Sequence, residues 1–177
     1  MKYLLKAGVL YEEEQGEQGV PLANIQNHYF GIEKQIHVGE ALFYTGVAKE
    51  SAPMERLVRA CPKRYFMRVA GGTILLSGTP KYARNEDPSV IGWPVYKVPH
   101  VDSAELSMQG HDAHLQMVNS QNYLLVDIYG REIIRILHRG VIGGWRVEAE
   151  EGFSYEMICG IFVFCRYLEQ ENELLVV

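Results

Sequence analysis

Cysteine is scarce in this sequence of 177 residues, which holds only Cys61, Cys159 and Cys165 and no Cys-x-x-Cys pair. Two of the three lie in an apolar run, so the disulfide framework of a small secreted domain is not expected. The N-terminus lacks the uninterrupted apolar stretch of a signal peptide, because Lys6 breaks it and glutamates follow at 12–14. We therefore expect reduced thiols and a soluble protein of the cytoplasm.

Signatures of catalysis are lacking as well, since the sequence holds neither a Gly-x-Ser-x-Gly elbow nor a glycine-rich phosphate loop opening a helix. His111 and His114 resemble a metal pair, but residues three apart on a strand point to opposite faces, and surface-loop histidines are expected instead. We expect His138 to be a hydrogen-bonded histidine of the barrel rather than a catalytic base. Cys61 lies near positively charged residues, which could lower the pKa of a thiol, but we expect a loop cysteine rather than a nucleophile. We predict no catalytic residues, no metal ligands and no cofactor.

The net charge of −5 is distributed unevenly along the chain. Residues 1–50 carry four Lys/Arg and seven Asp/Glu, and residues 101–177 carry five and twelve. Residues 51–100, in contrast, carry eight Lys/Arg and only three Asp/Glu. An acidic protein is a poor candidate for non-specific nucleic-acid binding, so we expect no such partner. The basic middle segment could still form a local patch for an anionic ligand.

Short alternating segments indicate a single, mostly-β domain over residues 1–177, because no linker or repeat divides the chain. Residues 145–150 alternate apolar and polar side chains, which is typical of a half-buried strand. Residues 3–11 have a similar alternating face and are predicted as one strand. The glycine pair at 71–72 and the Tyr-Gly-Arg turn at 129–131 separate further strands and predict two hairpins.

The remaining segments give weaker signals. Residues 30–38 and 41–48 predict two more strands. Residues 51–62 predict a short helix that begins and ends near prolines. Residues 84–103 contain three prolines and predict a long loop with one edge strand near Val95.

Nine residues without a charge, 157–165, interrupt the strand pattern. They predict a helix over residues 153–169, roughly 25 Å long at ~1.5 Å per residue. This helix would be apolar all round, so it must be buried on every side or inserted in a membrane. A spanning helix needs about 20 apolar residues, and Glu156 and Arg166 fall inside the window. Burial by the chain's own strands is therefore expected, which implies a closed or nearly closed antiparallel barrel without a transmembrane span.

The last third of the chain resembles the tubby C-terminal domain-like superfamily, which includes tubby proteins, phospholipid scramblases, plant LURP-one-related proteins and small bacterial relatives. The likeness is carried by the run at 123–136, the strand at 145–150 and the helix at 155–168, in the family's order. It covers residues 110–170 well and the first half loosely. The resemblance implies a barrel of about 12 strands enclosing the helix. No phosphoinositide-binding motif is recognisable, so no ligand residue follows from it.

The best candidate site is the basic middle segment. Arg64 and Arg68 share one face of a predicted strand with Phe66 between them, and forked guanidiniums beside an aromatic ring suit phosphate. The candidate ligand-binding residues are Arg56, Arg59, Lys63, Arg64 and Arg68. A second outward row, at Arg131, Arg135 and Arg139, is a lesser candidate. The alternative for both sets is a solvated barrel exterior.

These observations predict a non-enzymatic binding or scaffold domain. The resemblance makes an anionic phospholipid head group at the cytoplasmic membrane face the most plausible partner. The alternative is a protein–protein interaction or adaptor domain without lipid affinity, which the net acidity favours slightly. A barrel enzyme or small-ligand carrier is a weaker third class, because the helix would fill the lumen.

Overall fold

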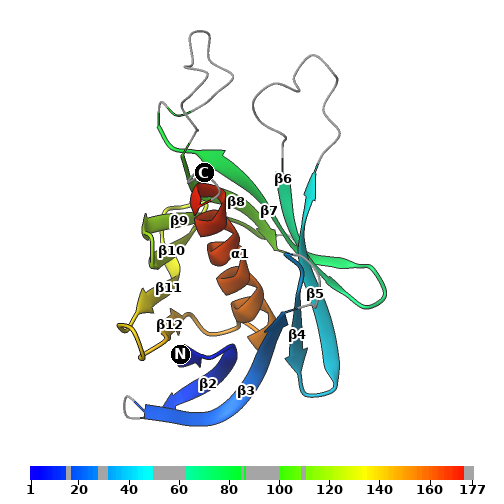
Figure 1. The fold of residues 1–177 in the computed structure, drawn as a ribbon, viewed down its shortest axis with the longest axis vertical. Helices are drawn as coiled ribbons and strands as arrows, with labels where there is room; N and C mark the ends of the chain where they lie inside the picture. Colours follow the sequence, from blue (N-terminus) through cyan, green and yellow to red (C-terminus); the bar gives the residue numbers. More distant parts are fainter. Residues whose placement is uncertain are drawn as a thin grey trace.

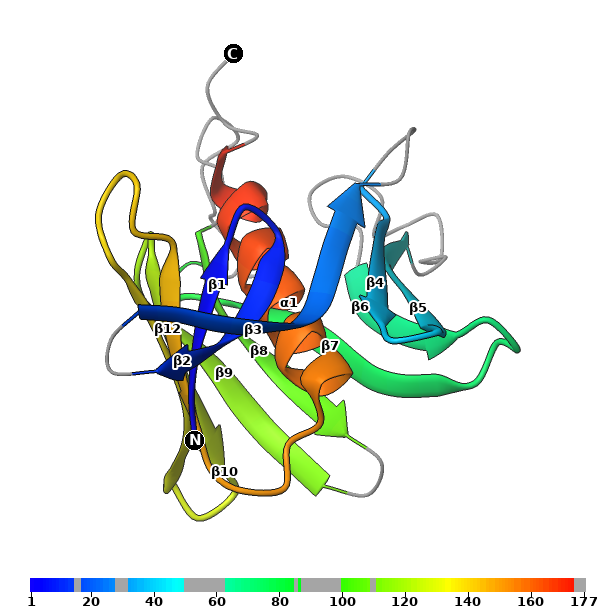
Figure 2. The same ribbon diagram turned by 90° about the horizontal axis from the view of Figure 1, so that it is seen from below.

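The computed structural model describes residues 1–14, 17–27, 32–49, 63–84, 86, 100–108 and 111–173. These residues form a closed antiparallel barrel of twelve strands with one helix inside it (Figures 1 and 2). Each strand pairs with its neighbours in sequence, and the first closes on the last. The elements are β1 (Lys2–Lys6), β2 (Val9–Glu14), β3 (Glu17–Asn27), β4 (Lys34–Val38), β5 (Ala41–Lys49), β6 (Lys63–Val69), β7 (Ile74–Tyr82), β8 (Val101–Met108), β9 (His111–Asn119), β10 (Asn122–Asp127), β11 (Glu132–His138), β12 (Trp145–Ala149) and α1 (Tyr155–Glu173).

The predicted fold class is confirmed: the chain is mostly β, with an apolar C-terminal helix enclosed by a closed barrel. Helix α1 begins after Ser154, whose carbonyl accepts the first helical hydrogen bond from the Ile158 amide at 3.1 Å. The helix ends at Glu173, four residues beyond the predicted end at residue 169. Hydrogen bonds to strand β8 hold its last turn in place. The Asn172 side chain accepts a hydrogen bond from the backbone amide of Val101 at 3.0 Å and donates one to the backbone carbonyl of Val101 at 2.8 Å.

The core lies between α1 and the inner face of the strands. Ile161 and Phe164 are completely buried, and the Tyr65 ring of β6 packs edge-on against Phe164 with 5.5 Å between centroids. The Tyr167 hydroxyl lies 3.0 Å from the Thr45 hydroxyl, and burial raises the pKa of Tyr167 to about 12. A Cβ added to Gly160 would meet the Met67 sulfur at 2.5 Å, so this glycine lets α1 approach β6 closely. Residues 158–165 of α1 are all buried, as expected for a helix with strands around it.

The structure corrects several local predictions. Residues 3–11 are not one strand but the β1–β2 hairpin, whose turn places Ala7 at φ 50° and Gly8 at φ 81°. His111 and His114 lie in β9 rather than in a loop, and His114 Nδ1 approaches Glu105 Oε1 at 3.3 Å. Strand β8 begins at Val101, inside the predicted loop of residues 84–103.

The other predicted strands have counterparts in the barrel. Both predicted hairpins are present as β6–β7 and β10–β11, and the strand at 145–150 is β12. The predicted strands at 30–38 and 41–48 correspond to β4 and β5. The short helix at 51–62 and the edge strand near Val95 lie outside the described residues.

The two helical cysteines provide a test of the burial of α1. Cys159 and Cys165 are free and buried, and burial raises the pKa of Cys159 to about 12 and that of Cys165 well above its ordinary value. Because the thiolate is the reactive form, we expect both to resist alkylation at pH 8 in the folded protein. Intact-mass measurement after denaturing, non-reducing alkylation should show three modified cysteines, Cys61 included. A disulfide in that sample would contradict the prediction of reduced thiols.

Candidate functional site

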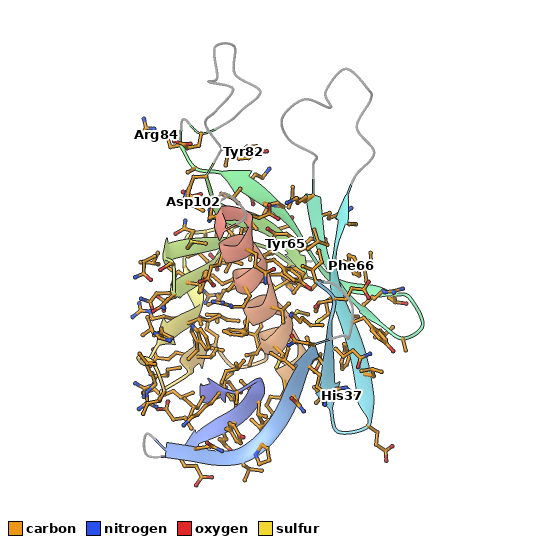
Figure 3. The ribbon with its side chains drawn as sticks, viewed as in Figure 1. His37, Tyr65, Phe66, Tyr82, Arg84 and Asp102 are labelled. Carbon is orange, nitrogen blue, oxygen red and sulfur yellow. The ribbon has the colours of Figure 1, made fainter. Side chains whose placement is uncertain are left out.

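The outer surface of β5 and β6 carries the first candidate site. Along β6, Tyr65 and Met67 point inward and are completely buried. Arg64 and Arg68 are exposed on the other side of the strand, as the sequence predicted, with half-buried Phe66 between them. Figure 3 shows Tyr65 on the helix side of β6 and Phe66 on its outer side. We call Arg64, Phe66, Arg68 and Tyr44 of the neighbouring strand the β5–β6 face.

Aromatic rings hold one guanidinium of the β5–β6 face. The Arg68 guanidinium carbon lies 5.9 Å from the Tyr44 ring centroid and 5.8 Å from that of Phe66. Phe66 is itself fixed over Gly46 of β5, where an added Cβ would lie only 2.6 Å from the ring. Cation–π contact with two rings keeps Arg68 close to the sheet and leaves its charge unneutralised.

Neither arginine of the β5–β6 face has a carboxylate of the described residues within ion-pair distance. Among the residues that the structure describes, Arg64 donates to the hydroxyl of Ser77, with 3.3 Å between Nη2 and Oγ. Within the described part of the chain, Arg68 contacts the rings of Tyr44 and Phe66. Both guanidiniums therefore keep donors and charge that an anionic ligand could use.

The structure separates Lys63 from this face. Lys63 is on the inward-facing side of β6, and its ammonium donates to the Glu171 carboxylate of α1. Burial raises the pKa of Tyr65 well above its ordinary value, and the negative charge of Glu171 raises it further. Lys63 thus neutralises a carboxylate that fixes the end of the helix. Arg56 and Arg59 lie outside the described residues, so the described structure unites only two of the five predicted residues.

The second arginine row is paired with carboxylates. Arg131 Nε lies 3.2 Å from an Asp127 oxygen, and its Nη1 lies 3.6 Å from Glu150. Arg135 binds Glu132 at 2.5 Å. Arg139 Nη1 lies 3.7 Å from Glu13 Oε1. Because each cation already faces a carboxylate, this row is less able than the β5–β6 face to attract an anion.

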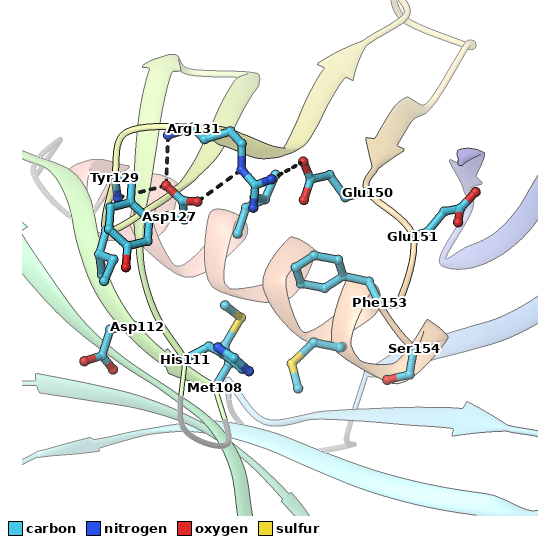
Figure 4. A pocket seen from close by; sticks show the side chains of 14 residues that line it. Met108, His111, Asp112, Asp127, Tyr129, Arg131, Glu150, Glu151, Phe153 and Ser154 are labelled. Carbon is cyan, nitrogen blue, oxygen red and sulfur yellow. Dashed lines mark hydrogen bonds and ion pairs between the residues drawn. The ribbon is translucent and has the colours of Figure 1, made fainter.

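A cavity of about 720 Å³ opens where α1 begins and forms the second candidate site (Figure 4). Its walls come from the ends of β8 and β9, the β10–β11 turn and the segment that joins β12 to α1. Apolar side chains form its deeper part: Met108, Ile133, Phe153 and Met157. Carboxylates are frequent at its mouth. The sequence did not reveal this site, because its walls are far apart in the chain.

His138, which was predicted to be a hydrogen-bonded barrel histidine rather than a catalytic base, lies at the end of β11. The His138 ring packs 5.0 Å from the Trp145 ring, centroid to centroid, and its backbone amide donates to Asn122 Oδ1 at 2.8 Å. Among the described residues no group of three or more His, Cys, Asp or Glu side chains could hold a metal ion. In the same part of the chain, no helix is long and apolar enough to cross a membrane.

Comparisons of the chain with protein-family models, with curated proteins and with solved structures found no match.

Proposed function

We propose that this chain is a non-enzymatic binding domain of the tubby C-terminal domain-like type, and that its β5–β6 face binds anionic phospholipid head groups at the cytoplasmic membrane face. The closed barrel of twelve strands around an apolar C-terminal helix agrees with the fold that the resemblance implies. The completely buried Ile161 and Phe164 indicate that the helix fills the lumen, which favours binding at the outer surface.

One observation carries the proposal: Arg64 and Arg68 are exposed, while no described carboxylate pairs with either. A guanidinium can donate two parallel hydrogen bonds to a phosphate. Each arginine close to an anionic membrane surface contributes about 1 kcal/mol of binding free energy. The flanking Tyr44 and Phe66 rings add surface suited to the interfacial region, where aromatic side chains are enriched.

The test is co-sedimentation of the wild-type protein with phosphatidylcholine vesicles that do or do not contain phosphatidylserine. We expect binding only to the phosphatidylserine vesicles. The bound fraction should fall as salt shortens the Debye length, which is about 8 Å at physiological ionic strength. If the protein ignores anionic vesicles even at low salt, the lipid proposal fails, and an adaptor that binds a protein partner takes its place.

A further inference from the structure

We propose that the cavity where α1 begins binds aliphatic ammonium cations, meaning amines with a short hydrocarbon chain. This site is separate from the β5–β6 face, and the inference does not rest on the lipid proposal. Its volume of about 720 Å³ lies within the range of roughly 300–1,000 Å³ that is usual for small-molecule sites.

The deeper part of the cavity suits a hydrocarbon chain. Met108 and Ile133 are almost fully buried, at 6% and 8% exposure, and yet they line the cavity. Phe153 and Met157 pack against the core and also line it. Methionine side chains adapt to chains of different shape, and the phenyl face of Phe153 can also attract a cation. A ligand would therefore be held partly by apolar contact.

The charges at the mouth determine the sign of the ligand. Four carboxylates line the cavity: Asp112, Asp127, Glu150 and Glu151. Arg131 lies between two of them and is within ion-pair distance of Asp127 and Glu150. Asp127 also accepts hydrogen bonds at 2.9 Å from the backbone amides of Tyr129 and Arg131, so its role is to hold the turn. No described cation lies within ion-pair distance of Asp112 or Glu151, so their charge is left for a ligand.

The placement of the two remaining carboxylates fits an amine with a hydrocarbon chain. Figure 4 shows Asp112 and Glu151 on opposite sides of the cavity, with Met108 and Phe153 between them. A chain lying over Met108 and Phe153 would direct its ammonium group to one carboxylate. The start of α1 carries a partial positive charge, which opposes a cation. Glu156 in its first turn counters that charge, and the carboxylates at the mouth outnumber Arg131.

The experiment titrates the protein at pH 8 with hexylammonium, hexyl sulfate and hexanol. The readout is the ¹³C-methyl NMR spectrum of the six methionines. Hexylammonium should shift the methyl signals of Met108 and Met157 and leave that of Met67, which lies against Gly160 in the core, unchanged. Its affinity should exceed that of hexyl sulfate by about tenfold, because the ammonium gains one exposed ion pair while the sulfate meets a repulsion of similar size.

Substitutions test the role of the two carboxylates. At least one of the substitutions Asp112→Asn and Glu151→Gln should weaken hexylammonium binding by about two- to fivefold, the size of one exposed ion pair. Glu40→Gln, which removes the same charge from the exposed β4–β5 turn, should have no effect. The proposal is overturned if hexyl sulfate binds as tightly as hexylammonium. It is also overturned if neither substitution weakens binding, or if the shifted signals belong to methionines outside the cavity.

Discussion

Replacement of Ile161 by aspartate is expected to prevent the protein from accumulating in folded form. Ile161 lies in the middle of α1, has no exposed surface and is surrounded by the inner faces of the strands. A carboxylate there would be buried without a partner, which costs several kcal/mol. A domain of this size has a free energy of unfolding of only about 5–15 kcal/mol. Phe162→Asp should act in the same way, because Phe162 is 7% exposed and its ring packs against Trp145.

The measurement is the amount of soluble protein after expression, followed by thermal unfolding of any protein recovered. Val141→Asp is the matched control: it also exchanges an apolar residue for aspartate, but Val141 is completely exposed in the β11–β12 turn. The control should accumulate and unfold like the wild type. A soluble Ile161→Asp protein with unchanged melting would contradict the central position of α1.

Much of this architecture could be predicted from local sequence. The charge-free run at 157–165 indicated a helix buried on all sides, and the glycine turns indicated the β6–β7 and β10–β11 hairpins. The β1–β2 hairpin was missed because residues 3–11 keep an alternating pattern through the turn, where Ala7 adopts a positive φ. Strand β8 was missed because prolines upstream of Val101 indicated a loop.

The candidate sites were predictable only where they depend on a single strand. Alternation along β6 was enough to place Arg64 and Arg68 on one face. The inward role of Lys63 was not predictable, because its partner Glu171 lies 108 residues away in the sequence. The cavity beside α1 was missed for the same reason, since several separated segments form it. Contacts between distant segments leave no periodic signal in the sequence.

Reversal of both charges on the β5–β6 face, Arg64→Glu with Arg68→Glu, is expected to abolish binding to anionic vesicles. Each arginine contributes about 1 kcal/mol near the surface, and each glutamate would add a repulsion of similar size. Loss of roughly 4 kcal/mol corresponds to about a thousandfold in affinity. The fold should persist, because both side chains are exposed and the substitutions remove one hydrogen bond and two surface cation–π contacts but no ion pair within the described residues.

The matched control is Lys2→Glu with Lys6→Glu. These two lysines are also exposed, also four residues apart and also on one strand, β1, so the change in net charge is the same. If attraction depended on net charge alone, both double variants would lose binding equally. If the β5–β6 face is the binding surface, the β1 variant should lose much less.

Co-sedimentation of the two double variants with phosphatidylserine vesicles at low salt, beside the wild type, is therefore the most direct test of the proposed function. We predict that the Arg64/Arg68 variant remains in the supernatant while the Lys2/Lys6 variant retains most of the wild-type binding. Equal binding of the two variants, whether both sediment or both do not, would contradict a specific role for the β5–β6 face.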